Sequence, residues 1–203
     1  VLATSPTIAT VANASSAAGT YPITVTGGSA ANYHLSYQNG TLAVGEGAQV
    51  IHFVSELNAT YGQAALTLEG NATSGLSLGY SSSNPAVAEV NGSKLLILGS
   101  GTSVITAYQG GNANFDAAPD RNATLQVGKA TLTVKANDAS KAYLAAVPSL
   151  SYELLGFVND ENASVLATSP TIATVANASS AAGTYPITVT GGSAANYHLS
   201  YQN

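Results

Sequence analysis

An internal duplication constrains this 203-residue chain more than any other feature of its sequence. Residues 1–39 recur without a single change as residues 165–203, which gives a period of 164 residues. A weaker repeat lies inside the long one, because the segment that begins at Gly19 aligns with the segment that begins at Gly101, at an offset of 82 residues. A fixed period is typical of tandem arrays, so we expect two related domains of roughly 80 residues in each long repeat.

The repeat also predicts where the domains begin and end. We expect residues 1–45 to be the C-terminal half of one domain type and residues 46–128 to be a complete domain of a second type. Residues 129–203 are then the first type again without its last strand. Because the chain opens at Val1 in the middle of this pattern, we expect it to be a window on a longer precursor.

Short segments with a period of two indicate strands. Tyr21, Ile23 and Val25 alternate with polar residues in 20–26, and Ala130, Leu132 and Val134 do the same in 129–135. Further strands are expected at 49–54, 65–69, 76–81, 94–98, 103–108 and 124–127, with Gly- and Asn-rich turns between them. We therefore predict an all-β chain of tandem Ig-like β-sandwich domains.

Composition excludes several functional classes. The net charge is -5 and the five basic residues are dispersed, so no surface can neutralise a run of phosphates, and nucleic acid is not an expected partner. No apolar run approaches the roughly 20 residues that span a bilayer, so we expect no membrane insertion within this segment. Without cysteine, and with histidines that lack acidic partners at a fixed spacing, the chain is not expected to be an enzyme or to hold a metal or cofactor.

Two local features are predicted to be structural. Asp160 and Glu161 are adjacent acidic residues, which we assign to a solvated loop because Ca²⁺ needs six to eight oxygen ligands. Tyr33, Tyr197 and Phe115 each follow an Asn at equivalent positions. We expect these aromatic rings to close the end of a sandwich.

Residues 129–203 resemble a known family, the MBG-type Ig-like repeat of large prokaryotic surface and secreted proteins. The resemblance depends on Lys129–Asn137, Leu155–Val158, Gly183–Ile187 and Asn196-Tyr197. One departure is Tyr143-Leu144, where the family has an acidic residue or a glycine after the tyrosine. The resemblance implies a spacer or adhesive domain and carries no catalytic residues.

The segment between the two copies resembles the bacterial Ig-like (Big) repeat that often alternates with the MBG type. Its hallmarks are Tyr61-Gly62, Ser74-Gly75, Ser82–Pro85 and Gly101-Thr102. Together the two resemblances imply a structural repeat of an extracellular or cell-surface filament or stalk, in which neighbouring copies of the repeat are partners. A carbohydrate- or protein-binding module of a secreted protein is the alternative, since eleven tyrosines are available for stacking.

Half of the sixteen asparagines begin an Asn-x-Ser/Thr tripeptide, where chance predicts about three or four. These candidate glycosylation sites are Asn13, Asn39, Asn58, Asn71, Asn91, Asn122, Asn162 and Asn177. N-linked glycans would solubilise a surface with few charges. The same tripeptides arise where Asn marks a turn and Ser or Thr begins the next strand, so both explanations stay open.

The closing strand is a candidate link between repeats. In the first copy it consists of Gly40, Thr41, Leu42, Ala43 and Val44, and the second copy ends at Asn203, before its equivalent. Under one hypothesis the chain continues past Asn203 into such a strand. Under the other, separately made subunits polymerise by donating this strand to one another.

Overall fold

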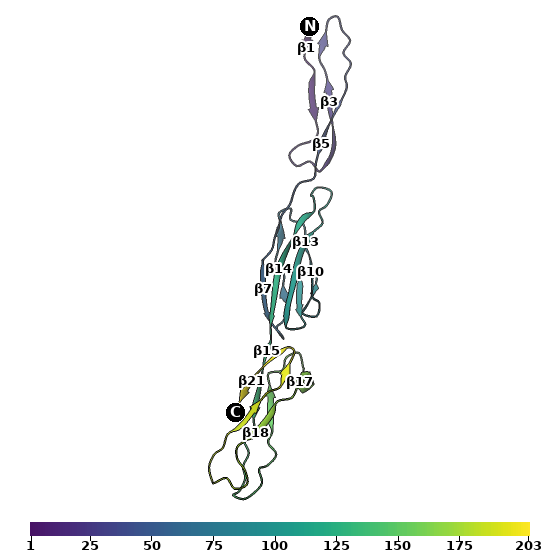
Figure 1. Ribbon diagram of the computed structural model, residues 1–203. Coiled ribbons are helices and arrows are strands. Elements are labelled where there is room, and N and C mark those ends of the chain that lie inside the picture. Colours follow the sequence, from purple (N-terminus) through teal and green to yellow (C-terminus); the bar gives the residue numbers. More distant parts are fainter. The chain divides into compact units, whose positions relative to one another are not determined.

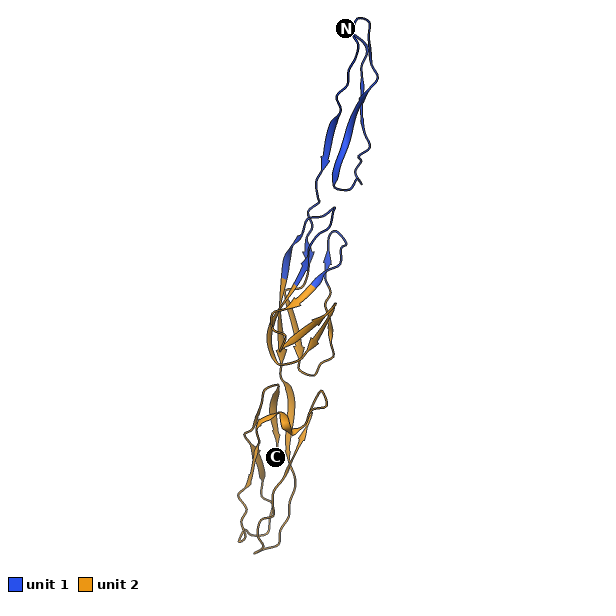
Figure 2. Ribbon diagram, turned by 90° about the vertical axis from the view of Figure 1, so that its right-hand side faces the viewer, with its two compact units in different colours: residues 1–52, 70–79, 107–121 blue, residues 53–69, 80–106, 122–203 orange.

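The structure is a computed structural model that describes residues 1–203, and it divides into two compact units. The first consists of residues 1–52, 70–79 and 107–121, and the second of residues 53–69, 80–106 and 122–203 (Figure 2). Almost all regular structure is β-strand, and the single helical element is a three-residue 3₁₀ turn, η1 (Ala163–Val165). The predicted all-β class is therefore confirmed, with several small sheets consistent with Ig-like β-sandwich domains.

The first copy of the duplicated segment and the strand that follows it form two small antiparallel sheets (Figure 1). One contains β1 (Leu2–Thr4) and β4 (Ser29–Ala30), and the other has the order β2-β3-β5, with β2 (Thr7–Thr10), β3 (Gly19–Thr26) and β5 (Gly40–Val44). The alternation predicted for 20–26 is seen in β3. No residue in 1–48 is buried, so this part of the chain has no core of its own.

The middle of the chain contributes nine strands. They are β6 (Ile51–His52), β7 (Glu56–Thr60), β8 (Leu66–Thr67), β9 (Asn71–Ala72), β10 (Gly79–Ser82), β11 (Ala88–Asn91), β12 (Lys94–Ile97), β13 (Gly101–Gln109) and β14 (Ala118–Gly128). The sheets have the orders β6-β9, β11-β12-β8 and β10-β13-β14-β7, and β14 pairs in parallel with β7. All six strands expected here exist, although β6 and β8 keep only two residues of the ranges predicted for them.

The core within the second unit is aliphatic. Its largest cluster contains Leu95, Ile105 and Leu125, each 0% exposed, together with Val87, Ala88 and other apolar residues. Phe53 and Tyr80 pack against this cluster and contact each other, with their ring centroids 5.5 Å apart. Burial of this apolar area is the main stabilising contribution that these strands make.

The last part of the chain contains β15 (Ala130–Ala136), β16 (Tyr152–Leu155), β17 (Leu166–Thr168), β18 (Thr171–Thr174), β19 (Ile187–Thr190), β20 (Ser193–Ala194) and β21 (Tyr197–Gln202). β15 is the central strand of a sheet ordered β16-β15-β21, antiparallel to β16 and parallel to β21. Ala130, Leu132 and Val134 of β15 are buried, as their alternation predicts.

The identical segments 1–39 and 165–203 do not have identical structures. Tyr197–Gln202 forms β21 on the edge of β15, whereas the same residues at 33–38 form no strand, because residues 1–45 contain no equivalent of β15. Conversely, β3 begins at Gly19, but its counterpart β19 begins four residues later, at Ile187, because β5 has no equivalent there. Which strands form is thus decided by the partners available, not by the local sequence.

Candidate functional site

One residue connects two successive sheets of the second unit. β14 ends at Gly128 and β15 begins at Ala130, so Lys129 alone lies between them. The Tyr61 amide donates to the Gly128 carbonyl oxygen at 2.9 Å, and the Lys129 ammonium donates to the Ala194 carbonyl oxygen at 3.1 Å. A connection of this length, bonded on both sides, leaves little freedom for a hinge.

Two tyrosines and a glutamate fix this junction, which we call the tyrosine joint and define as Tyr61, Glu161 and Tyr197. The Tyr61 hydroxyl donates to Oε1 of Glu161 at 2.8 Å, and the Tyr197 hydroxyl donates to Oε2 of the same carboxylate. The two rings meet edge to face with centroids 5.7 Å apart, and they are 6% and 2% exposed. Hydrogen bonds to a carboxylate are roughly twice as strong as neutral ones, so these contacts hold the two rings in a defined orientation.

A second set of contacts lies beside the tyrosine joint. The Ser100 amide donates to Oδ1 of Asn196 at 2.9 Å, and the Ser100 hydroxyl donates to the Ala195 carbonyl oxygen at 3.1 Å. Phe157 packs against the ring of Tyr197 with centroids 5.8 Å apart. Segments far apart in sequence therefore meet through both polar and apolar contacts.

Burial and, after it, the hydrogen bond to the Glu161 carboxylate raise the pKa of Tyr197 from its ordinary value of 10.0 to about 12. In the unfolded chain the phenol ionises near its ordinary value, so the stabilising contribution is complete below pH 10 and is lost as the pH rises towards 12. We expect the free energy of unfolding to fall by about 2 kcal/mol over this range. Urea unfolding as a function of pH measures it.

Tyr197→Phe is the control for this pH dependence, because it keeps the ring and removes the ionisable group. The variant should lose stability less steeply between pH 10 and pH 12. Equal slopes in the two proteins would contradict the assignment of this titration to Tyr197.

The sequence prediction for these residues was partly right. Tyr197 closes the end of its sheet as expected, whereas Tyr33 is 72% exposed, because no strand like β15 pairs with residues 33–38. The expected solvated loop is correct for the exposed Asp160, but Glu161 is only partly exposed and accepts both tyrosine hydroxyls. No group of three or more His, Cys, Asp or Glu side chains is placed to hold a metal ion.

All eight candidate glycosylation asparagines are exposed. Where these side chains form hydrogen bonds within the protein, Oδ1 accepts and the amide nitrogen does not donate. Asn13 and Asn177, the repeat copies of one another, lie in turns in which Oδ1 accepts from the Ser two residues later. Asn162 is the N-cap of η1, and Asn122 accepts from the Thr106 hydroxyl at 2.8 Å.

The candidate inter-repeat strand, residues 40–44, is the edge strand β5. It pairs antiparallel with β3 from Gly19↔Val44 to Ile23↔Gly40. Asn39, directly before it, accepts a hydrogen bond from the Val25 amide at 3.2 Å. Four of the five residues of β5 are exposed.

The fold and the tyrosine joint define an all-β protein of tandem Ig-like repeats. The MBG domain family, YGX type, matches residues 2–43 and 132–203, which is more than half of the chain. The chain therefore belongs to the MBG domain family. Residues 44–131 lie outside the match, so their assignment to the bacterial Ig-like repeat stays a prediction. No curated protein matches the chain.

No helix of the structure has the length and apolar character needed to cross a membrane.

Leu144 occupies a backbone conformation that suits glycine. Its φ is 64°, in the left-handed region. A non-glycine residue is strained there by roughly 1–2 kcal/mol, and the side chain is 67% exposed, so little packing is lost on its removal. We expect Leu144→Gly to raise the free energy of unfolding by about 0.5–1 kcal/mol, measured by urea titration.

Leu144→Ala is the matched control, since it trims the side chain and keeps the left-handed strain. A stabilisation of the same size in Leu144→Ala would contradict the backbone explanation.

Proposed function

We propose that this chain is a structural module of an extracellular or cell-surface repeat protein, which serves as a stalk or filament and has no catalytic role. In this proposal MBG domains alternate with a bacterial Ig-like domain at residues 46–128. The domains 1–45 and 129–203 are two parts of the MBG type, and neighbouring repeats are the main partners.

The observation that supports this role best is the tyrosine joint and its one-residue connection. A stalk must keep its domains in a fixed relation while it extends, and a short linker with buried contacts on either side does so. Tyr61 belongs to the proposed bacterial Ig-like domain, whereas Glu161 and Tyr197 belong to the MBG domain. In this proposal the contact joins unlike domains. A repeat in which the two types alternate would therefore form the same contact at each such junction.

Electron microscopy of the native material tests the proposed role. We expect filaments or stalks in which density for two alternating domain types repeats with the period of the sequence. Isolated, dispersed monomers in native material would contradict the proposal.

N-linked glycans are part of the proposal, because they would protect a surface in which only 7% of residues are charged. We expect peptide mass spectrometry of the native protein to find sugars on the exposed sequon asparagines. Asn112 and Asn114 are matched controls, because they are exposed but do not begin a sequon. Unmodified asparagine at all eight sequons would contradict the proposed glycosylation.

A further inference from the structure

The chain enters and leaves the sheet β10-β13-β14-β7 through a parallel pair of strands. β7 is the first strand of this sheet along the sequence, and β14 is the last. The two strands pair from Glu56↔Thr124 to Thr60↔Gly128. In a parallel pair the start of one strand lies beside the start of the other. The chain therefore enters the pair at Glu56 and leaves it at Gly128, at opposite ends of the same ladder.

Backbone hydrogen bonds extend this ladder to both of its ends. At one end the Thr124 amide donates to the Ser55 carbonyl oxygen at 2.9 Å. At the other end the Tyr61 amide donates to the Gly128 carbonyl oxygen at 2.9 Å. The pair is thus bonded from the point where the chain enters β7 to the point where it leaves β14.

Alternate residues of β7 turn their backbone groups towards β14. Ser55 and Tyr61 bond to β14 and are an even number of positions apart, so residues 57 and 59 have the same orientation. The amides of Leu57 and Ala59 therefore face β14. The amide of Asn58 points the other way, where no strand pairs with β7, because β7 is an edge strand of this sheet.

The inner face of the pair is attached to the core. Leu125 and Val127 of β14 are 0% and 5% exposed and belong to the buried cluster. Leu57 and Ala59 of β7 pack against the same cluster. Sliding one strand past the other therefore disrupts apolar contacts as well as the ladder bonds.

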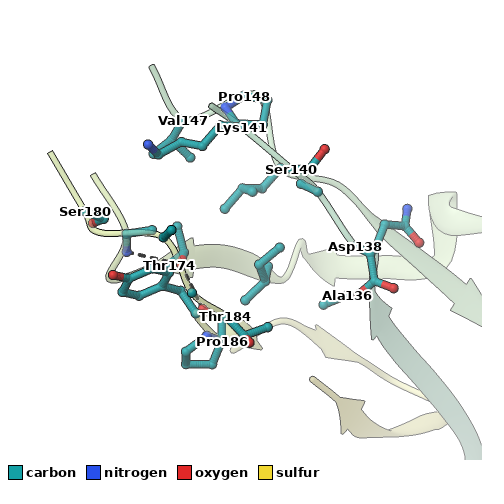
Figure 3. A pocket seen from close by; sticks show the side chains of 18 of the residues that line it. Ala136, Asp138, Ser140, Lys141, Val147, Pro148, Thr174, Ser180, Thr184 and Pro186 are labelled. Carbon is teal, nitrogen blue, oxygen red and sulfur yellow. Dashed lines mark hydrogen bonds between the residues drawn. The ribbon is translucent and has the colours of Figure 1, made fainter. Parts of the chain in front are cut away.

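A single residue transmits force to this pair from the C-terminal side. Lys129 connects Gly128 to Ala130, the first residue of β15. β15 ends at Ala136, which lines a cavity of about 680 Å³ together with Asp138 and other residues (Figure 3). The cavity thus lies at the opposite end of β15 from the residue through which the force arrives.

We propose that the parallel pair of residues 56–60 and 124–128 is a tension clamp, the element that resists force along the chain. Tension pulls Glu56 and Gly128 in opposite directions, so the two strands are sheared past each other. The ladder bonds are then loaded together, whereas a pair pulled apart at one end opens bond by bond. Resistance to force depends on this barrier to unfolding. The inference rests on the proposed stalk role and names the element that would carry its load.

The direction of pulling tests the tension clamp. The chain has no cysteine, so DNA handles on Glu56→Cys and Gly128→Cys load the ladder along its length. Handles on Glu56→Cys and Asn122→Cys pull at one end of the ladder and open it from there. All three positions are exposed, and the one atom within 4 Å of a Cβ at Gly128 is the Ala59 carbonyl oxygen, at 3.8 Å. Single-molecule force spectroscopy should give an unfolding force at least about twice as large for the first pair of handles.

Proline substitutions test the ladder under tension applied at both ends of the full chain. Ala59→Pro removes an amide that faces β14, and it should lower the force that unfolds residues 56–128 by about a third or more. Asn58→Pro is the matched control, because it removes an amide that faces no strand. It should lower the force by less than about a tenth.

Leu95→Ala separates mechanical resistance from chemical stability. Leu95 is 0% exposed and lies in β12, outside the loaded pair. Its truncation should lower the urea midpoint, but the variant should keep a higher unfolding force than Ala59→Pro.

Equal forces in the two pulling directions would overturn the tension clamp, and so would equal losses of force in Ala59→Pro and Asn58→Pro. Either result leaves filaments in native material possible. Dispersed monomers in native material would instead contradict the proposed function and leave the directional difference in force intact, so the two failures are distinguishable.

Discussion

Tyr197→Ala is expected to lower the free energy of unfolding by about 3–5 kcal/mol, whereas Tyr33→Ala should change it by less than about 0.5 kcal/mol. The two tyrosines lie at the same position of identical sequences, but Tyr197 is 2% exposed and Tyr33 is 72% exposed. Truncation of Tyr197 leaves a cavity beside Phe157 and removes one of the hydroxyl groups that donate to Glu161. Urea unfolding followed by tyrosine fluorescence measures both variants, because the chain has no tryptophan.

Tyr197→Ala and Tyr33→Ala are compared in the same sequence context. Every residue within the 39-residue duplication is the same in both copies, so local propensity cannot explain a difference. Equal effects of the two substitutions would contradict the conclusion that partner strands decide which copy has a core.

Gly62→Ala is expected to lower the free energy of unfolding by about 2–4 kcal/mol. Gly62 has a φ of 83°, and a Cβ at this position would lie 2.5 Å from Cβ of Val158. The substitution therefore adds left-handed strain and forces the segments on either side of the tyrosine joint apart. Urea unfolding gives the change in stability, and amide exchange of Val158 reports whether the joint has opened.

Gly75→Ala separates the backbone strain from the close contact with Val158. Gly75 has a similar φ of 77° but has no atom within 4 Å of the position of a Cβ. It should lose only the conformational term, roughly 1 kcal/mol. Equal losses for the two variants would show that close packing against Val158 contributes nothing.

The sequence predicted a strand best where apolar and polar residues alternate and a neighbouring strand pairs along the same residues. In 129–135 the alternation correctly predicted which face of β15 is buried. In 49–54 only two residues are in β6, because a short stretch of apolar residues does not specify how far its partner extends. Strand length is a property of the pair, and one strand alone does not encode it.

The sequence analysis did not predict the tyrosine joint, because its contacts join residues that are distant in the sequence. Glu161 lies 100 positions after Tyr61 and 36 positions before Tyr197, and no spacing rule connects the three residues. Adjacent acidic residues in a Gly- and Asn-rich region are usually solvated, which led to the wrong expectation for Glu161.

The proposed role depends most on one property of the tyrosine joint, namely that it holds the sheets on either side of it in a fixed relation. The chain has no cysteine, so Glu89→Cys and Glu153→Cys place two spin labels uniquely, at exposed positions of β11 and β16 on either side of the joint. Double electron–electron resonance then measures the distribution of distances between the labels. Our account predicts one narrow distribution that becomes broad when Tyr197→Ala is added. A broad distribution in the labelled protein with Tyr197 intact would contradict the account.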